Sequence, residues 1–301
     1  MRIVVTGSSG MLGRATVQNL LGAGHTVLGV DATPLADSPC RTFVGDLREP
    51  YTIHRALDHF GDGTDAIVHL ANHRNAESAP GETVLRENLA MNTSVAMAAL
   101  QTAIPRLVFS SSIQAFVGGI QRNLTGEIIY PDRFPIDESL PPKPMNPYGL
   151  SKLLTEHMLD HLCNPEQFQS PLTALSLRFP YLMPQHHIEM VAERTAPTDY
   201  RWGGAEAFAY LHMEDAAEAV RLACEVSTPN HQVLWLAAPD PRTPESPAEL
   251  AARFYESVPG VETVLQRNSF VDCSKARSIL GWEPARTITV ERAARAARTT
   301  P

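Results

Sequence analysis

Short apolar runs alternate with longer segments of helical periodicity over the first part of the chain. The runs are rich in β-branched residues and predict strands at Ile3–Val5, Thr26–Val30, Ala66–Leu70, Leu107–Ser110 and Ala174–Arg178. The segments between them carry Ala, Leu and Met at helical spacing, as in Val84–Ala103. Because strands that alternate with helices favour right-handed crossovers, the pattern predicts an α/β fold with a Rossmann, doubly wound parallel sheet.

This regularity fades after Phe179. Repeated prolines predict a loop-like stretch to about Gly204, and regular patterns resume over Phe208–Ala223 and Val233–Ala237. The expected organisation is a large domain at residues 1–179 and a smaller C-terminal region at 180–301, of which residues 206–238 return to the sheet.

The tail beyond Pro244 predicts two helices around an extended piece. Near its end, Asp272 can cap a short helix that runs to Leu280. Gly281 then provides a left-handed stop, with Pro284 beyond it.

Composition and charge exclude several classes of function. The 301 residues suffice for a large core, and the formal net charge of −8 comes without a cationic stripe, so no nucleic-acid partner is expected. The chain starts directly with a short strand and has no apolar run of about 18 residues, which predicts a cytoplasmic protein with no membrane partner. Its four cysteines form no Cys-x-x-Cys pair, so we expect reduced thiols and no metal site.

A glycine-rich segment, Thr6-Gly7-Ser8-Ser9-Gly10-Met11-Leu12-Gly13, joins the first predicted strand to a helix. Glycines in this position permit a tight turn and a close approach of the backbone to a ligand. The free N–H groups and positive dipole of a helix N-terminus attract a pyrophosphate. The expected dinucleotide-binding residues are Gly7, Ser9, Gly10, Met11, Leu12 and Gly13.

Asp31 ends the second predicted strand, where an acid can bind the ribose 2′-hydroxyl of NAD. Its carboxylate repels the 2′-phosphate of NADP and no arginine follows directly, so NAD is favoured over NADP. Arg14 and Arg41 are the residues that could reverse this preference, although a solvated surface arginine is the alternative interpretation of each. Asp46 and Leu47 follow another short apolar run and are candidates for the adenine edge, although a turn that starts with an aspartate explains Asp46 nearly as well.

The stretch Asn146-Pro147-Tyr148-Gly149-Leu150-Ser151-Lys152 predicts the start of a capped helix. Tyr148 falls in its first turn, and Lys152 follows four residues later on the same face. A tyrosine normally ionises at about pH 10, and a nearby lysine cation lowers that pKa toward the range of a useful general base. Ser112 follows the fourth predicted strand, at the sheet edge where ligands bind. We therefore expect Ser112, Tyr148 and Lys152 to be catalytic.

With these motifs in this order, the chain resembles the extended short-chain dehydrogenase/reductases, the NAD-dependent epimerase/dehydratase family, over nearly its whole length. Further segments carry the resemblance: His69-Leu70-Ala71, Asn88, Ser110 to Ser112, Leu177-Arg178-Phe179-Pro180, Leu211 to Ala216, Asp272 to Ala276 and Leu280 to Pro284. The resemblance implies NAD as the cofactor and a homodimer built on the helices of Asn88–Ala103 and Tyr148–Cys163. It also implies a set of cofactor-lining residues: Leu70, Ala71, Asn72, Asn88, Ser110, Tyr148, Lys152, Phe179 and Pro180.

Two differences from branches of this family reduce the set of reactions and substrates that we expect for this chain. Its dehydratases typically carry Thr-Asp-Glu where this chain has Ser112-Ile113-Gln114, so dehydration is disfavoured. Its nucleotide-sugar epimerases usually devote a long segment to the nucleotide, whereas only about thirty residues separate Pro180 from His212 here, which favours a smaller substrate.

The segment Asp199-Tyr200-Arg201 is similar to part of the uronate dehydrogenases, which oxidise a free sugar acid, and Arg201 can pair with a carboxylate. A solvated surface arginine is the alternative interpretation. Those enzymes follow the catalytic serine with Asn-His, which this chain lacks, and the loop at 118–130 is enlarged. The candidate substrate ligands are Ser111, Gln114 and Arg201.

The leading interpretation is an NAD-dependent oxidoreductase that transfers a hydride to or from a sugar or sugar-acid carbon by a Ser-Tyr-Lys mechanism. The alternative is an epimerase that retains NAD and returns the hydride to the opposite face of a sugar or nucleotide sugar. A third hypothesis is a non-enzymatic NAD-sensing regulator, because a fold alone does not guarantee chemistry. Such regulators commonly lose the tyrosine or the lysine, and Tyr148 and Lys152 are both present.

Overall fold

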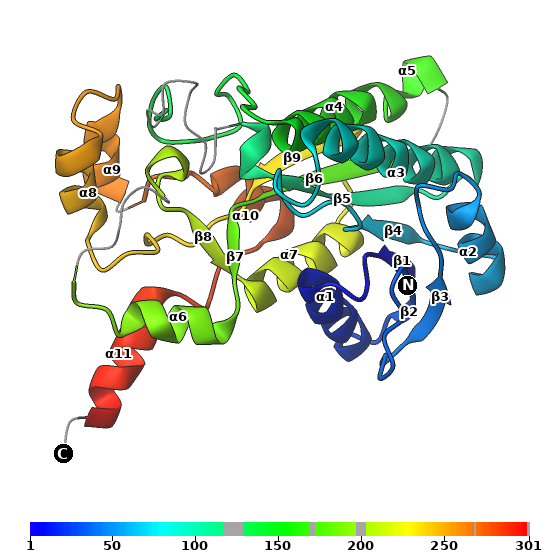
Figure 1. Ribbon diagram of the computed structural model, residues 1–301, viewed down its shortest axis with the longest axis horizontal. Helices are drawn as coiled ribbons and strands as arrows, with labels where there is room; N and C mark the ends of the chain where they lie inside the picture. Colours follow the sequence, from blue (N-terminus) through cyan, green and yellow to red (C-terminus); the bar gives the residue numbers. More distant parts are fainter. Residues whose placement is uncertain (117–128, 169–171, 197–202, 268, 300–301) are drawn as a thin grey trace. The chain divides into compact units, whose positions relative to one another are not determined.

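The computed structural model describes residues 1–301 except 117–128, 169–171, 197–202, 268 and 300–301 (Figure 1). Seven strands form its main sheet: β1 (Arg2–Thr6), β2 (Thr26–Asp31), β3 (Arg41–Val44), β4 (Ala66–His69), β5 (Arg106–Ser112), β6 (Thr173–Phe179) and β9 (His231–Trp235). The strand order is β3-β2-β1-β4-β5-β6-β9, and the pairs from β3 to β5 are parallel. The direction of winding reverses between β1 and β4, so the predicted doubly wound α/β sheet is confirmed.

The chain forms two compact units, each made of three segments. Unit 1 comprises Met1–Ser111, Pro147–Leu177 and Ala217–Val233. Unit 2 comprises Ser112–Asn146, Arg178–Ala216 and Leu234–Pro301. The simpler division into residues 1–179 and 180–301 stays a prediction.

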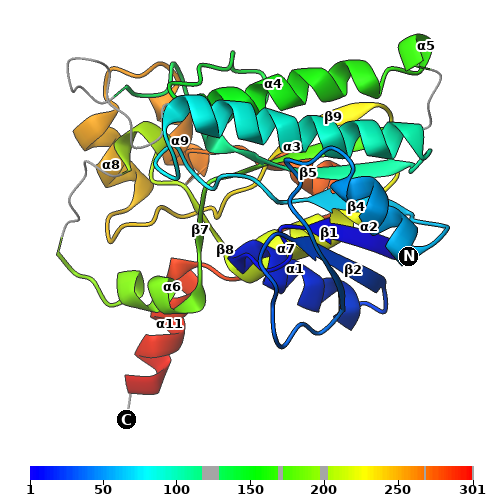
Figure 2. The same ribbon diagram turned by 45° about the vertical axis from the view of Figure 1, so that its right-hand side comes forward.

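Unit 1 buries an aliphatic core. Its helices are α1 (Met11–Gly22), α2 (Thr52–Phe60), α3 (Gly81–Gln101), α4 (Pro147–Leu162) and α5 (Pro165–Phe168), with most of α7 (Met213–Glu225). Val4, Leu28, Ile67 and Leu107, from four neighbouring strands, are buried in this core. Helices α3 and α4 lie side by side in both views (Figure 1, Figure 2). No helix within the described ranges is long and apolar enough to cross a membrane.

Unit 2 contains shorter elements around an aromatic core. They are β7 (Tyr181–Met183), α6 (Gln185–Ala192), β8 (Tyr210–His212), α8 (Pro247–Phe254), α9 (Val261–Arg267), α10 (Ser274–Leu280) and α11 (Ile288–Thr299). β7 and β8 pair in parallel. We call Phe134, Phe208, Tyr255 and Phe270 the aromatic cluster, in which the Tyr255 ring centroid lies 5.1 Å from that of Phe134 and 5.2 Å from that of Phe270. The Tyr255 hydroxyl donates a hydrogen bond to the Gly204 carbonyl oxygen at 2.6 Å.

Two expectations for this part of the chain were wrong. The stretch predicted as a loop to about Gly204 contains β7 and α6, which are too short to show a clear period, and Pro184 occupies the N-cap position of α6 instead of ending an element. The tail beyond Pro244 contains four helices among its described residues, where the pattern predicts two. The first of them begins with a capping box in which Ser246 and Glu249 exchange hydrogen bonds.

The predicted end of α10 is confirmed, whereas its N-cap residue is Cys273, one position after the predicted Asp272. The Asp272 carboxylate accepts a hydrogen bond from the Ser274 N–H at 2.9 Å, just before the first turn. Gly281 follows Leu280 with φ at +63°, the left-handed conformation that ends a helix.

One buried carboxylate holds the last segment of unit 2. Asp215, only 3 % exposed, accepts hydrogen bonds from the N–H groups of Ala285 (3.0 Å) and Arg286 (2.8 Å) and from the Arg286 guanidinium (2.8 Å). The Trp282 indole N–H donates to the Asp215 carbonyl oxygen at 3.0 Å. A buried carboxylate needs such donors, so residues 282–286 complete the surroundings of Asp215.

Candidate active site

The glycine-rich turn between β1 and α1 can form only with glycine at two positions. Gly7 has φ at +71°, and a Cβ on it would lie 2.8 Å from the Ala71 nitrogen. A Cβ on Gly13 would lie 2.0 Å from the Gly7 carbonyl oxygen. The turn therefore keeps its backbone open, next to the first N–H groups of α1, which have no partner within the helix. This cradle fits the pyrophosphate of a dinucleotide.

Asp31 lies at the end of β2 and is fixed by backbone donors. One carboxylate oxygen accepts the Ser9 N–H at 2.9 Å and the other accepts the Thr33 N–H at 2.9 Å. The Ser9 hydroxyl donates to the Thr33 carbonyl oxygen at 2.7 Å. Each carboxylate oxygen keeps a second lone pair, so the group can still accept ribose hydroxyls.

Asp46 is engaged by a neighbouring arginine. Its carboxylate accepts the Arg48 N–H at 2.9 Å and pairs with the Arg48 guanidinium, which lowers the pKa of Asp46. Arg48 also pairs with Glu87 at 3.0 Å. The following residue, Leu47, is buried, so its side chain is part of the unit 1 core.

The catalytic candidates Tyr148 and Lys152 lie one turn apart in α4, as their spacing predicts. The Lys152 amino group donates hydrogen bonds to the Asn72 side-chain oxygen at 2.8 Å and to the Ser110 carbonyl oxygen at 2.7 Å. Its Nζ lies 5.4 Å from the centroid of the Tyr148 ring. Burial lowers the pKa of the Lys152 ammonium to about 7, although the charge of Glu156 acts in the opposite direction. A lysine so placed can stabilise a phenolate on the same helix face.

The last two serines of β5, Ser111 and Ser112, belong to different units. In unit 1, the Ser111 hydroxyl donates to the buried Glu156 carboxylate at 2.6 Å. In unit 2, the Ser112 hydroxyl accepts the Gln114 N–H at 3.2 Å, and the Gln114 side-chain oxygen accepts the Asn146 amide at 2.9 Å. Phe179 and Pro180, both buried, also belong to unit 2. Arg201 and most of the 118–130 loop lie outside the described residues.

The family model of the NAD dependent epimerase/dehydratase family matches residues 3–234. This chain belongs to that family. The resemblance inferred from the motifs is thereby confirmed.

The proteins similar to this chain include both dehydrogenases and epimerases. The L-arabinose 1-dehydrogenase (NAD(P)(+)) of Haloferax volcanii is 28 % identical over 234 residues, which cover 76 % of this chain and 84 % of that protein. A UDP-glucose 4-epimerase of Streptomyces lividans is 30 % identical over 169 residues, but these cover 52 % of this chain and only 46 % of the epimerase.

The fold is also that of a solved structure, the uronate dehydrogenase variant of Agrobacterium tumefaciens complexed with NAD. The two share 19 % identity with a TM-score of 0.65, over 100 % of this chain and 90 % of that one. At this identity the likeness concerns the fold.

A group of polar side chains lies behind the lysine of this epimerase/dehydratase family member, and its central member, Asn92, was not predicted from the sequence. We call His69, Asn72, Asn88 and Asn92 the amide cluster. Asn92 contacts the His69 ring nitrogen Nε2 at 2.9 Å, accepts the Asn72 amide at 2.7 Å and donates to the Thr155 hydroxyl at 2.7 Å. The signal for Asn92 was present as polar residues four apart, and so on one face of each helix: Asn88 with Asn92 and Ser151 with Thr155.

Two further members of the amide cluster order the residues around the cofactor cradle. Asn88 accepts the His73 N–H at 2.8 Å and donates to the Ser151 hydroxyl at 3.0 Å. His69 contacts the Thr6 hydroxyl at 2.7 Å through Nδ1, and burial lowers the pKa of His69 to about 3. Its imidazole is therefore neutral and acts as a hydrogen-bonded structural group.

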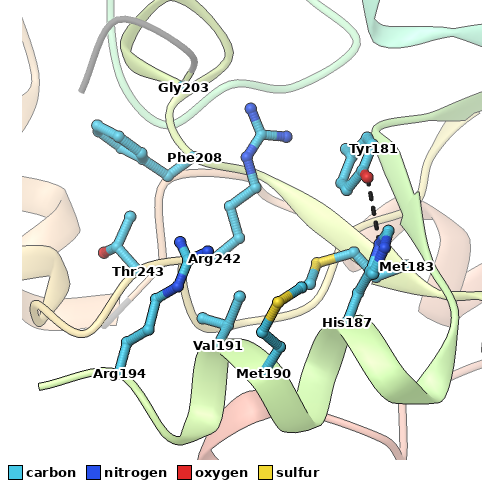
Figure 3. A pocket seen from close by; sticks show the side chains of 10 residues that line it. All are labelled: Tyr181, Met183, His187, Met190, Val191, Arg194, Gly203, Phe208, Arg242 and Thr243. Atoms are coloured by element: carbon cyan, nitrogen blue, oxygen red, sulfur yellow. Dashed lines mark hydrogen bonds between the residues drawn. The ribbon is translucent and has the colours of Figure 1, made fainter. Parts of the chain in front are cut away.

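Unit 2 contains a pocket of about 310 Å³, lined partly by the stretch that the sequence predicts as a loop (Figure 3). Arg194 and Arg242 both line it, and Arg242 lies near Tyr181. The Arg242 guanidinium lies 5.2 Å from the Tyr181 ring centroid and pairs with Glu206 at 3.1 Å. The Tyr181 hydroxyl contacts His187 Nδ1 at 3.3 Å, the dashed line in Figure 3. The pocket thus combines positive charge with an aromatic face.

Proposed function

We propose that this chain is an NAD-dependent dehydrogenase that acts on a hydroxyl or carbonyl carbon of a sugar or sugar acid. The observation that carries the proposal is the buried amino group of Lys152, which Asn72 and Ser110 hold one helical turn from Tyr148. A lysine desolvated in this way is expected at a functional site.

The proposed roles of the three catalytic residues follow from their chemistry. NAD, when bound, supplies the hydride acceptor. Tyr148 takes the proton of the substrate hydroxyl, and the Lys152 ammonium stabilises the phenolate form that this requires. The Ser112 hydroxyl hydrogen-bonds the reacting oxygen and holds it for the transfer.

The proposed cofactor site uses the glycine cradle for the pyrophosphate and Asp31 for the adenosine ribose. The dehydrogenase of Haloferax volcanii, which covers most of this chain, supports a nicotinamide dinucleotide as the cofactor. The proposed lining residues are Gly7, Ser9, Gly10, Met11, Leu12, Gly13, Asp31, Asp46, Leu47, Leu70, Ala71, Asn72, Asn88, Ser110, Phe179 and Pro180.

The proposed substrate is small. The short segment between Pro180 and His212 and the likeness to an arabinose dehydrogenase favour a free sugar over a nucleotide sugar. Arg194 in the unit 2 pocket supplies positive charge, which supports a sugar acid, whereas Arg242 is paired with Glu206. Ser111, Gln114 and Arg201 stay candidate ligands.

The assembly and location are also proposals. We infer that residues 1–179 bind NAD, that residues 180–301 bind the substrate, and that the protein is a cytoplasmic homodimer. Packing of α3 and α4 from two copies, as the family resemblance implies, would form the dimer.

An NAD-retaining epimerase is the second candidate, because epimerases are among the similar proteins. The two functions differ in whether the hydride leaves with the cofactor. Purified protein that carries stoichiometric NAD and shows no net absorbance change during turnover would support the epimerase.

The test is a screen of aldoses, uronates and nucleotide sugars with NAD, followed by absorbance of NADH. Tyr148→Phe is expected to lower turnover by about 10²–10⁴-fold while NAD binding remains, because the variant lacks only the proton-accepting oxygen. Tyr51→Phe is the matched control, since Tyr51 is 76 % exposed at the start of α2. Equal activity of the Tyr148 variant and the control would contradict the proposed mechanism.

A further inference from the structure

Glu156 is a buried carboxylate that the proposed mechanism does not use. It lies in α4 four residues after Lys152, and the two residues are only 3 % and 2 % exposed. Residues four apart on a helix lie on the same face. Because a buried charge is unfavourable unless another group offsets it, a carboxylate at this position requires a physical reason.

Two consecutive residues of β5 hold these side chains. The Ser110 carbonyl oxygen accepts a hydrogen bond from the Lys152 amino group at 2.7 Å. The Ser111 hydroxyl, which is also buried, donates to a Glu156 carboxylate oxygen at 2.6 Å. The end of β5 therefore fixes both an amino group and a carboxylate of one face of α4.

The surroundings of the Lys152 amino group favour the loss of its proton. Its Nζ lies 4.9 Å from the Phe109 ring centroid, and burial lowers the pKa of Lys152 to about 7. Within the described part of the chain, the titratable side chains that face it are His69, Tyr148 and Glu156. The His69 ring is neutral, and a tyrosine is negative only as a phenolate. Glu156 thus supplies the negative charge that opposes the effect of burial.

We propose that Glu156 is a positioning residue that keeps the Lys152 amino group protonated, and that Ser111 orients the Glu156 carboxylate for this purpose. The inference rests on the proposed function, because it concerns the lysine that stabilises the Tyr148 phenolate. An ammonium group stabilises a phenolate by its charge, which a neutral amine lacks. The carboxylate therefore acts on the reaction only through Lys152.

The test follows the protonation of Lys152 directly, which is practicable because the chain has only three lysines: Lys143, Lys152 and Lys275. Protein isotope-labelled at the lysine Cε carbon is titrated by NMR without sugar, and the resonance missing from Lys152→Met identifies this residue. Glu156→Gln removes the charge with little change of shape. It is expected to lower the titration midpoint of Lys152 by about one pH unit or more, because an opposite charge nearby is lost.

Asp160→Asn is the matched control. Asp160 is the next acidic residue of α4, four positions after Glu156, and it also contacts a side chain from another element, His231 Nδ1 at 2.7 Å. Removal of this charge is expected to leave the Lys152 midpoint unchanged, since the effect belongs to the carboxylate next to the lysine.

A second measurement separates this role from a merely structural one. With a midpoint one unit lower, the protonated fraction of Lys152 at pH 7 falls from about one half to about one tenth. The kcat/KM of Glu156→Gln at that pH is therefore expected to be about fivefold below that of the wild type. The deficit is expected to shrink as pH falls toward about 5.5, where the lysine is largely protonated in both proteins. A structural defect would lower activity at every pH.

If Glu156→Gln does not fold, the double variant Ser111→Ala/Glu156→Met removes both partners of the hydrogen bond, and the same shift of the Lys152 midpoint is expected. An unchanged midpoint in a folded variant, or an equal shift in Asp160→Asn, would overturn the inference and leave the proposed dehydrogenase intact. A lowered midpoint in Glu156→Gln, with a wild-type protein that turns over none of the sugars, would support the effect of Glu156 on Lys152 and contradict the proposed function.

Discussion

Two buried groups of side chains differ in how they fix their members. The amide cluster of unit 1 is held by directional hydrogen bonds, and its Asn92 alone contacts His69, Asn72 and Thr155. The aromatic cluster of unit 2 is held by the edges and faces of rings around Tyr255. Hydrogen bonds fix the direction of a group, whereas ring packing fixes mainly volume. The difference teaches that the buried polar groups of unit 1 orient Lys152, and that Asn72 makes the direct contact with this lysine.

The largest expected effect comes from removing the group that the amide cluster orients. Lys152→Met is expected to lower turnover by at least about 100-fold, because the phenolate of Tyr148 loses its cation. The unfolding midpoint in urea is expected to stay near that of the wild type, since burial of an ammonium is unfavourable. The control is Lys275→Met, a partly buried lysine of unit 2 whose pKa burial also lowers. An equal loss of turnover in both variants would show that turnover does not depend specifically on Lys152.

The comparison of the two clusters can be tested with two substitutions that each remove polar atoms from a buried side chain. Asn92→Leu removes one hydrogen-bond partner from each of His69, Asn72 and Thr155, so we expect a loss of about 3 kcal/mol in the free energy of unfolding. Tyr255→Phe removes one hydrogen bond, to Gly204, and is expected to lose about 1 kcal/mol. Urea unfolding followed by circular dichroism measures both. An equal or larger loss in Tyr255→Phe would show that unit 2 depends on a directional hydrogen bond as much as unit 1 does.

The smallest effect near neutral pH comes from His69. Its pKa in the folded chain is about 3, below that of an unfolded histidine, so the unfolded chain binds the proton first as pH falls. Protonation of His69 does not affect the free energy of unfolding above about pH 6.5. Below that pH, this free energy declines by about 1.4 kcal/mol per pH unit. Urea unfolding between pH 7.5 and pH 5 is expected to show a shallower decline in His69→Gln than in the exposed control His59→Gln. The same slope in both would exclude His69 as the cause.

Local signals made much of the site predictable. The glycine turn, the Pro147 start of α4 and the spacing of Tyr148 and Lys152 depend on residues within one or two turns of each other. The sheet was predictable because the strands on its inner positions are apolar on both faces. The end of α10 at Gly281 was predictable for the same reason, because the signal lies next to the helix in the sequence.

The features that were not predicted depend on contacts between residues that lie far apart in the sequence. Asn92 reaches Thr155, 63 residues later, and although a pair of polar residues four apart is visible around each of them, no local pattern indicates that the two pairs bond to each other. β7 has only three residues and exists because it pairs with β8. The unit 2 pocket was missed for the same reason, since its two arginines come from segments that the prolines made look irregular.

The Asp215 carboxylate has a consequence for the order in which the chain can fold during synthesis. Its donors come from Ala285 and Arg286, about seventy residues downstream. Until that segment leaves the ribosome, the carboxylate has to stay hydrated and its surroundings open. Unit 1 likewise waits for residues 217–233 before it is complete. A nascent chain of this protein therefore spends most of its synthesis with both units unfinished, the period in which exposed apolar surface most invites aggregation.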